Sequence, residues 1–235
     1  MEDLTIIIPS RKERFLDNTI HEIFNKAKTK VKIIVTLDGY TTEPIDGVTY
    51  IHNEVPKGMR SAINQAVELA DTKYIMKLDA HCMLDEGFDV KLMEAHKDNW
   101  VQIPTRKRFD AHKWELTHDK PDVNYMYLNE DFIGIASRNQ GLDEMIHPTE
   151  TFQGSGYFMT KEYFNKLGLL DEEEFGIFKH EAQEIGFKVH KDGGQIIRNR
   201  NTWYAHPRLG RRHRLEEYDL NIKQLAEKYE YKRWS

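Results

Sequence analysis

Apolar residues in the first eighty positions follow two spacings, one typical of buried strands and one typical of amphipathic helices. Short runs rich in β-branched residues at 4–8, 31–37 and 48–51 predict strands. Between them, apolar residues recur at helical spacing over 20–27 and, most regularly, over 58–70. Strands that alternate with helices predict an α/β fold in which helices flank a mostly parallel central sheet.

The stretch Tyr74–Cys82 begins as a buried strand and ends in an Asp-x-His pair. Residues two apart in an extended chain point to the same side, so Asp79 and His81 present a carboxylate and an imidazole together. Such a pair is half of a divalent metal site. Both residue types also stabilise turns at strand ends, so the pair by itself leaves a turn-capping role open.

Polar residues follow three of the predicted strands. Pro9–Arg11 comes first, because Pro9 cannot donate to a strand ladder and is expected to end its strand. Asp38 follows the second strand, and Asp79 follows the strand just described. Ligands of parallel α/β sheets bind beyond the carboxyl ends of the strands, so we expect these residues to share one crevice. Asp17 or Asn18 is expected to cap the first helix.

The second half of the chain has a less regular pattern. Irregular strands and loops are expected from Thr105 to His147, after a short apolar run at 100–103. The further predicted elements are a glycine-punctuated strand at 152–159, a short helix capped by Thr160, a helix at 181–192, a strand at 195–197 and a helix at 215–229. We predict one domain over 1–235, with a nucleotide-binding half at 1–104, an acceptor and catalytic half at 105–214 and a C-terminal helix within 215–235.

Composition narrows the class of protein. The chain has 39% hydrophobic and 31% charged residues, which is typical of a soluble globular protein. No stretch approaches the roughly 20 apolar residues of a membrane span, and the N-terminus lacks the features of a signal peptide. The single cysteine, Cys82, excludes an intrachain disulfide. These features predict a cytoplasmic protein without stable membrane association.

Positive charge is concentrated in one segment, although the net charge is -5. Six arginines lie between 198 and 214 with no acidic residue among them: Arg198, Arg200, Arg208, Arg211, Arg212 and Arg214. Three interpretations remain open. Some of these side chains clamp a diphosphate, some hold an anionic acceptor such as DNA with modified bases, or the segment is a solvated face.

Taken in order, these residues resemble the family 2 glycosyltransferases and, in the second half, the polypeptide N-acetylgalactosaminyltransferases. The resemblance runs from Leu4 to about Arg208 and is weakest between Thr105 and Glu150. The stretches that carry it are Ile6–Glu13 with its Pro-x-x-x-Glu loop, Val35–Gly39, Gly58 with Ala62 and Asn64, Leu78–Cys82, Gln153–Phe158, Tyr163–Gly168, Glu181–Glu184, Gly193–Gly194 and Tyr204–Arg208. It implies a single-domain nucleotide-diphospho-sugar transferase fold of the GT-A type.

The resemblance also implies a set of site residues. Asp79, His81 and His206 are expected to hold Mn²⁺, with Mg²⁺ as the second choice, although His206 alternatively donates to a phosphate or a loop carbonyl. The donor is expected to be a nucleotide sugar, most naturally a UDP-sugar. Residues expected in its pocket are Pro9, Arg11, Glu13, Asp38, Arg60, Asn64, Asp79, Gly154 and Arg208.

Glu181 occupies the place where the resemblance puts a carboxylate near the sugar and acceptor. In inverting relatives this group deprotonates the acceptor hydroxyl, whereas in retaining relatives the region orients sugar and acceptor. The chain departs from both patterns, since Ala182 replaces a second acid and Phe178–His180 replaces an aromatic followed by two glycines. The Asp-x-His motif favours retention. Alternatively, Glu181 and Glu184 are first-turn acids that stabilise a helix N-terminus.

The leading hypothesis is therefore a metal-dependent glycosyltransferase that acts on an unidentified hydroxyl group of a glycan, a protein or hydroxymethylated DNA. One alternative is a sugar-phosphate nucleotidyltransferase, but such an enzyme is expected to carry a glycine-rich loop after its first strand, and 9–13 contains no glycine. The other alternative is a non-catalytic nucleic-acid-binding module built on the arginine-rich segment.

Overall fold

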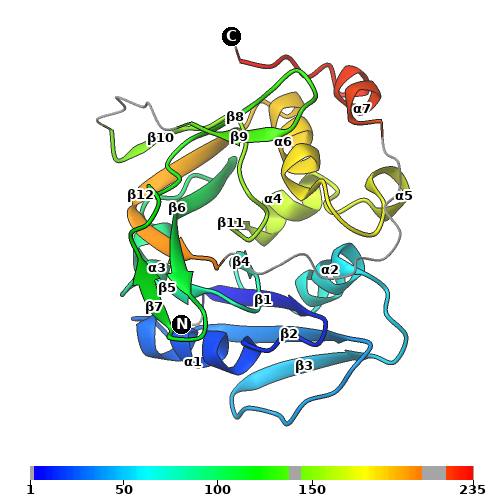
Figure 1. Ribbon diagram of the computed structural model, residues 1–235. Helices are drawn as coiled ribbons and strands as arrows, with labels where there is room; N and C mark the ends of the chain where they lie inside the picture. Colours follow the sequence, from blue (N-terminus) through cyan, green and yellow to red (C-terminus); the bar gives the residue numbers. More distant parts are fainter. Residues whose placement is uncertain (1–2, 138–143, 208–220, 235) are drawn as a thin grey trace.

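The computed structural model describes residues 3–137, 144–207 and 221–234 (Figure 1). The strands are β1 (Leu4–Ser10), β2 (Lys32–Asp38), β3 (Val48–Asn53), β4 (Tyr74–Leu78), β5 (Met83–Leu84), β6 (Trp100–Asp110), β7 (Glu115–Thr117), β8 (Met126–Leu128), β9 (Gly134–Ala136), β10 (Ile146–Pro148), β11 (Gly156–Thr160) and β12 (Gln195–Ala205). The helices are α1 (Leu16–Lys26), α2 (Met59–Leu69), α3 (Phe88–Glu94), α4 (Lys161–Lys166), α5 (Glu172–Phe175), α6 (Glu181–Lys191) and α7 (Ile222–Lys228).

One large sheet runs through both halves of the chain in the order β10-β12-β6-β11-β4-β1-β2-β3. Strands β3, β2, β1 and β4 are mutually parallel, as the sequence predicts. Strand β11 is antiparallel to both β4 and β6, while β12 is parallel to β6 and antiparallel to β10 and β5. The prediction of a mostly parallel central sheet flanked by helices is thus confirmed, and the shorter antiparallel pairings make the sheet mixed toward its β10 edge.

Two local predictions at the start of the chain are wrong. Strand β1 continues through Pro9 to Ser10, paired with β2. The other neighbour of β1, strand β4, pairs with it only as far as Ile7. Pro9 lies beyond this pairing, so the N–H that proline lacks is not needed for a hydrogen bond to β4. Helix α1 begins after Phe15 and has no side-chain cap. By contrast Thr160 does cap α4, because its hydroxyl accepts from the backbone N–H of Tyr163 at 3.1 Å.

Strand β12 is much longer than the three residues predicted at 195–197. The prediction stopped too early because the strand continues through buried polar residues, which an apolar pattern does not reveal. The amide of Asn199 donates to Oε1 of Gln102 in β6 at 2.9 Å, and Nη1 of Arg198 donates to the carbonyl of Pro104 at 2.6 Å. These bonds satisfy polar groups inside the sheet. Strand β6 is also longer than predicted, and short strands β7 to β10 occupy the region expected to be irregular.

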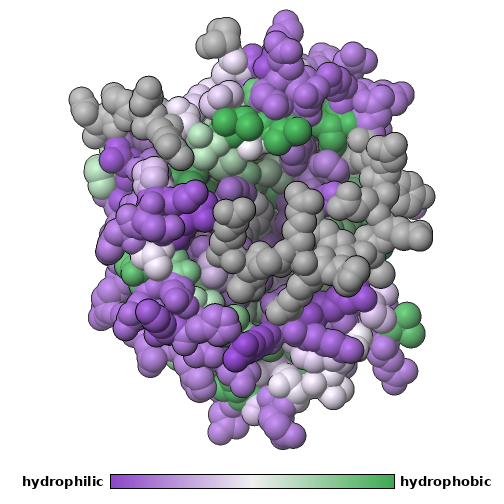
Figure 2. All heavy atoms as spheres, in the orientation of Figure 1, coloured by the Kyte–Doolittle hydropathy of each residue, from purple (hydrophilic) through white to green (hydrophobic). Residues whose placement is uncertain are grey.

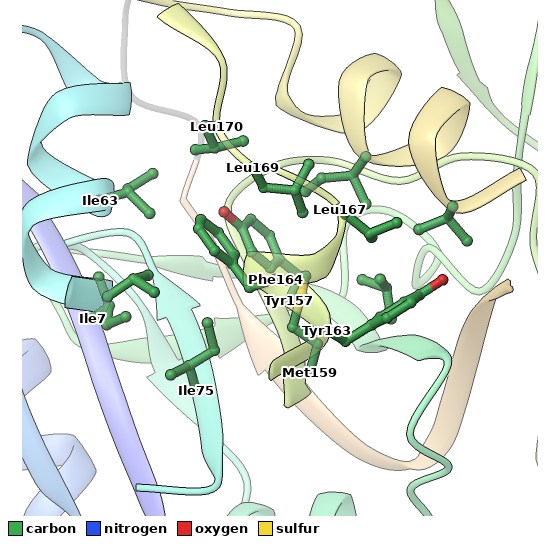
Figure 3. Packing of buried hydrophobic residues seen from close by; sticks show 14 of the residues in the cluster. Ile7, Ile63, Ile75, Tyr157, Met159, Tyr163, Phe164, Leu167, Leu169 and Leu170 are labelled. Atoms are coloured by element: carbon green, nitrogen blue, oxygen red, sulfur yellow. The ribbon is translucent and has the colours of Figure 1, made fainter. Parts of the chain in front are cut away.

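Two apolar layers cover the sheet, one on each face. Helices α1 and α3 pack on one face against alternate residues such as Ile6 and Met76. Helices α2, α4 and α6 pack on the other face against Ile7 and Ile75. In Figure 3, Ile63 of α2 lies on one side of this second layer, Tyr157 and Phe164 lie at its centre, and Leu169 and Leu170 lie above them.

The C-terminal residues fold back onto the second half of the domain. Helix α7 lies within the predicted helix at 215–229, of which 215–220 is outside the described residues. The backbone N–H of Trp234 donates to Glu150 at 2.8 Å, and Arg233 donates to the carbonyl of Leu128 at 3.3 Å. The face in Figure 2 is largely hydrophilic, with apolar side chains gathered near its upper edge. Among the helices described, none has the length and apolar character that spanning a membrane requires.

Candidate functional site

Three potential metal ligands meet where β4 and β12 end. Asp79 and His81 follow β4, and His206 follows the last residue of β12. Nε2 of His206 lies 3.2 Å from Oδ2 of Asp79 and 3.0 Å from Nε2 of His81, and the remaining Asp79–His81 distance is 3.9 Å. The pairing of β12 with β6 and with β5 therefore brings His206 next to the Asp-x-His motif, although it lies 127 positions after Asp79 in the sequence.

Further contacts fix the two imidazole rings. Nδ1 of His81 lies 3.2 Å from Oε2 of Glu13, in the loop after β1. A proton on Nδ1 that is donated to this carboxylate leaves Nε2 of His81 with its lone pair toward Asp79 and His206, as in metal sites where a carboxylate orients the histidine ligand. On the other ring, Nη2 of Arg106 donates to Nδ1 of His206 at 3.2 Å.

The chemistry of this donor set fits a divalent cation. One carboxylate oxygen and two imidazole nitrogens lie within 4.8 Å of one another, each on a residue that is only partly buried. Ligands about 2.1 Å from one octahedral ion are about 3 Å apart when adjacent, which matches two of the three separations. A mixed oxygen and nitrogen set suits Mn²⁺, and carboxylate with water also suits Mg²⁺.

Electrostatics keep Asp79 ionised. Burial opposes its charge, but the Lys77 ammonium and the hydrogen bond from His206 outweigh burial and hold the pKa of Asp79 well below its usual range. Burial lowers the pKa of His206, although Asp79 partly opposes this shift. The cluster therefore holds an ionised carboxylate, as a metal ligand needs, whereas Nδ1 of His206 accepts from Arg106, so Nε2 of the neutral ring carries its proton and binds an ion only if the contact with Arg106 is exchanged.

Lys77 is a buried cation beneath this cluster that the sequence interpretation missed. It lies in β4, is 2% exposed, and its Nζ donates to Oδ1 of Asp79 and to the carbonyl of Gly154, both at 2.6 Å. Oε2 of Glu181 lies 3.6 Å from the same Nζ. Burial lowers the pKa of Lys77, but Asp79 and Glu181 outweigh burial, so the net pKa is raised and Lys77 stays charged.

Glu181 lies at the start of α6 in a close-fitting niche. Its side chain is 7% exposed, and Oε1 accepts from the hydroxyl of Tyr157 at 3.3 Å. A Cβ atom at Gly154 would lie 2.6 Å from Oε2, so the absence of a side chain there makes room for the carboxylate. Burial raises the pKa of Glu181, and Lys77 partly opposes the shift.

The turn before Glu181 has an unusual backbone. Lys179 and His180 have φ values of 70° and 59°, the left-handed region that glycine adopts most easily. These are the two positions at which the resemblance to the retaining relatives implies a pair of glycines, which this chain replaces with lysine and histidine. Arg60 supports the turn, because its Nη2 donates to the carbonyl of Lys179 at 2.7 Å.

Several residues predicted to line the donor pocket instead bind other parts of the protein. Arg60 is fully buried and also pairs with Glu184, so its guanidinium has no exposed surface, and we assign it to support of α6. The amide of Asn64 bonds both the N–H and the carbonyl of Leu170, at 2.9 and 2.8 Å. Direct contact with a donor stays a prediction for Arg60 and Asn64, whose polar groups already have these partners within the protein.

Two of the remaining pocket residues, Pro9 and Asp38, lie near or at the ends of parallel strands, and Arg208 is outside the described residues. Asp38 is buried and accepts from the backbone N–H groups of Lys57 and Gly58, at 2.8 and 3.0 Å, so it holds the loop before α2. Pro9 lies at the end of β1, and Arg11, which follows, is exposed. Arg208 lies outside the described residues, so its role stays a prediction.

The arginine-rich segment is only partly described. Arg198 is 1% exposed within β12, so it is a core residue and not part of an anionic binding face. Burial lowers the pKa of Arg198 to about 10. Arg208, Arg211, Arg212 and Arg214 lie outside the described residues. Tyr204 packs in the core and bonds Ser155 at 2.9 Å.

Of the three residues that the sequence analysis missed, Lys77, Arg106 and Tyr157, only Lys77 left a clear signal in the sequence. A lysine in the apolar run 74–78, two positions before Asp79, must point to the same side as Asp79. Arg106 lies in the polar continuation of β6, which single-sequence periodicity did not identify as a strand. Tyr157 belongs to the predicted glycine-punctuated strand, but its contact with Glu181 depends on the packing of α6 against β11.

Comparison with known proteins gives consistent results. The model of the family described as glycosyl transferase family 2 matches residues 5–161. The putative polypeptide N-acetylgalactosaminyltransferase 13 of Drosophila melanogaster is 26% identical over 155 residues, covering 64% of this chain and 28% of that protein. Polypeptide N-acetylgalactosaminyltransferase 3 of Homo sapiens is 27% identical over 161 residues, covering 63% and 25%. The chain thus spans only about a quarter of the length of these relatives.

A solved structure has a similar fold. The crystal structure of GalNAc-T7 with UDP, GalNAc and Mn²⁺ matches with a TM-score of 0.80 at 16% sequence identity. The match covers 98% of this chain and 49% of that chain. At this identity the likeness establishes the shared fold.

Proposed function

Since the chain belongs to glycosyl transferase family 2 and has a GT-A fold, we propose that it transfers a sugar from a nucleotide diphosphate sugar to a hydroxyl group. The observation that carries this proposal is the convergence of Asp79, His81 and His206 at the ends of β4 and β12. The family match ends at residue 161, so His206 is placed in the cluster by the fold alone.

We propose a UDP-sugar as the donor and Mn²⁺, or secondarily Mg²⁺, as the ion. The solved structure of similar fold contains UDP, GalNAc and Mn²⁺, and the curated relatives are named as N-acetylgalactosaminyltransferases. The oxygen and nitrogen ligand set of the cluster supports the same choice. The sugar itself stays open.

Transfer breaks the bond between the sugar and a diphosphate, so negative charge grows on the leaving phosphate oxygens. Asp79, His81 and His206 would hold a divalent ion, which would supply Lewis-acid stabilisation of this charge. Glu13 orients His81 through Nδ1, and Lys77 holds Asp79 ionised. These residues are arranged before substrate binds, so little reorganisation is needed during the reaction.

We assign Glu181 to the orientation of sugar and acceptor. Its two carboxylate oxygens already face Tyr157 and Lys77, which fixes the direction of the group. A carboxylate held in this way is better suited to positioning than to accepting a proton from a mobile acceptor. We therefore favour transfer with retention of configuration.

The two alternative functions have less support. Membership of family 2 favours glycosyl transfer over nucleotidyl transfer. The burial of Arg198 removes one cation from the proposed nucleic-acid surface. An anionic acceptor, including hydroxymethylated DNA, stays a prediction, as do a glycan or protein acceptor, the cytoplasmic location and the division into two halves.

A thermal-shift screen of UDP-, GDP- and TDP-sugars with and without Mn²⁺ tests this function. A ligand that binds only the folded state raises the unfolding temperature. We expect the largest increase with a UDP-sugar plus Mn²⁺, and loss of both this increase and sugar transfer in Asp79→Ala. The control is Asp71→Ala, because Asp71 is exposed and pairs only with the surface residue Lys32 among the contacts described. Undiminished transfer by Asp79→Ala contradicts the assignment.

A further inference from the structure

We propose that Lys77 is a positioning residue that sets the geometry between the metal-binding carboxylate of Asp79 and the carboxylate of Glu181. This inference rests on the proposed function and adds a residue to its site. Lysine is rarely so completely buried unless its charge is paired. Here the side chain points from the next-to-last residue of β4 to the sheet face that carries α6, and it ends between two acidic groups.

The ammonium group has three donors, and three oxygens surround it. Oδ1 of Asp79 and the carbonyl of Gly154 are each 2.6 Å from Nζ, and Oε2 of Glu181 is 3.6 Å away. The oxygens come from three separate segments, namely the end of β4, the loop before β11 and the first turn of α6. Lys77 therefore links the segment that carries the metal ligands to the segment that carries Glu181.

The link also determines which Asp79 oxygen faces the histidines. Because Oδ1 is held by Lys77, Oδ2 is the oxygen turned toward His206, at 3.2 Å, and toward His81, at 3.9 Å. Without the ammonium, Oδ1 loses this contact, and the bond between His206 and Oδ2 remains as the hydrogen bond that orients the carboxylate among the side chains described. Asp79 and Glu181 would also face each other with no cation between them.

A second buried lysine shows what a purely structural role looks like. Lys188 in α6 is 8% exposed, and its Nζ donates to Oε1 of Glu184 and to the carbonyl of Gly168, both at 2.7 Å. It has the same kinds of partner as Lys77, a carboxylate and a backbone carbonyl, but none of these contacts reaches Asp79. Lys188 is therefore a matched control.

Residues that orient metal ligands typically change metal affinity or activity by about 10–100-fold when they are replaced. We expect Lys77→Met to weaken Mn²⁺ binding by a factor in this range. Electron paramagnetic resonance measures the affinity directly, since the signal of free Mn²⁺ falls as the ion binds. The titration is done on the full chain in the presence of UDP, and it requires no sugar transfer. Lys188→Met is expected to bind Mn²⁺ within twofold of the unmodified protein.

A second variant covers a failure of Lys77→Met to fold. Lys77→Gln keeps a neutral donor of shorter reach, so we expect intermediate Mn²⁺ affinity. Unchanged affinity in a folded Lys77 variant overturns the proposal. So does loss of cooperative unfolding in both Lys77 variants while Lys188→Met still folds, because that result assigns Lys77 to the fold alone.

The outcomes separate this proposal from the proposed function. If the unmodified protein binds Mn²⁺ with UDP but transfers no sugar from any UDP-, GDP- or TDP-sugar, the proposed function fails, and the Lys77 comparison still decides the positioning role. If the unmodified protein transfers sugar and Lys77→Met binds Mn²⁺ equally well, only the positioning role fails. If the unmodified protein binds no Mn²⁺, the metal site and the role of Lys77 toward it both fail.

Discussion

Arg60 and Lys179 are joined by a hydrogen bond of 2.7 Å from Nη2 of the arginine to the carbonyl oxygen of the lysine. This contact ties the first turn of α2 to the backbone just before Glu181. The same guanidinium pairs with Glu184, one turn into α6, so both sides of Glu181 are held by one buried side chain. The fold thereby maintains a left-handed turn that contains two residues other than glycine.

The first prediction concerns this turn. His180 has a φ of 59°, and a side chain in the left-handed region costs about 1 kcal/mol relative to glycine. We expect His180→Gly to have a free energy of unfolding about 1 kcal/mol higher than His180→Ala, measured by urea denaturation. Both variants lose the imidazole, so their difference isolates the backbone. Equal stability of the two variants contradicts the assigned backbone conformation.

The second prediction concerns the niche of Glu181. Gly154→Ala places a methyl group 2.6 Å from Oε2 of Glu181, closer than van der Waals contact allows, so the carboxylate must move. Displacements of about 1 Å in a site can cost about 100-fold in rate. We expect kcat/KM for sugar transfer to fall by 10- to 100-fold.

Gly186→Ala is the control for this substitution. Gly186 lies inside α6, and an added Cβ there would meet Ile196 at an ordinary 3.7 Å. Because alanine is the better helix former, this variant should be equally or more stable, by up to about 1 kcal/mol, with unchanged kcat/KM. A loss of activity in Gly186→Ala similar to that in Gly154→Ala rejects the specific role of the niche.

The third prediction concerns Glu13 and its bond to Nδ1 of His81. Glutamine at position 13 can still accept this hydrogen bond through its carbonyl but lacks the charge, whereas alanine removes the acceptor. We expect Mn²⁺ affinity to decrease in the order unmodified protein, Glu13→Gln, Glu13→Ala, with a total loss of about 10–100-fold. Isothermal titration with Mn²⁺ in the presence of UDP measures this series. Equal affinities in all three proteins remove Glu13 from the support of the metal site.

The sequence predicted the parts of the site that depend on local pattern. The apolar runs located β1, β2 and β4, and the alternation of side chains along an extended chain indicated Asp79 and His81 as neighbours. The approach of His206 was implied by resemblance and not by pattern, because the position of a residue beyond β12 depends on how that strand pairs. Periodicity could not show this pairing, since β12 carries Arg198 and Asn199 inside the core.

Arg60 illustrates the opposite limit. An arginine in the first turn of an amphipathic helix is expected to be exposed, and a resemblance placed it near the donor. Burial became possible only because Glu184 and the carbonyl of Lys179, both more than a hundred residues away, accept its hydrogen bonds. Long-range partners of this kind leave no local signature, so the sequence alone could not separate a ligand contact from a supporting role.

The last prediction concerns pH and His96, whose described contacts include none of Asp79, His81 and His206. Its ring packs on Tyr74 and Phe158, its Nδ1 accepts from Gln102 at 2.9 Å, and burial lowers its pKa to about 4. In the unfolded chain the pKa is about 6.5. Between these values the unfolded state binds more protons, so the free energy of unfolding is greatest above pH 6.5 and falls as the pH decreases toward 4.

The variant His96→Asn keeps a hydrogen-bond acceptor for Gln102 but cannot titrate. Between pH 6.5 and 5, the unmodified protein should lose about 1.5 kcal/mol more of its free energy of unfolding than this variant, since the slope rises from half of 1.36 kcal/mol per pH unit at pH 6.5 toward that full value at lower pH. Urea denaturation at several pH values gives both curves, and the contributions of other groups cancel in the difference. Parallel curves across this range would mean that His96 is accessible to protons in the folded protein, which contradicts its burial.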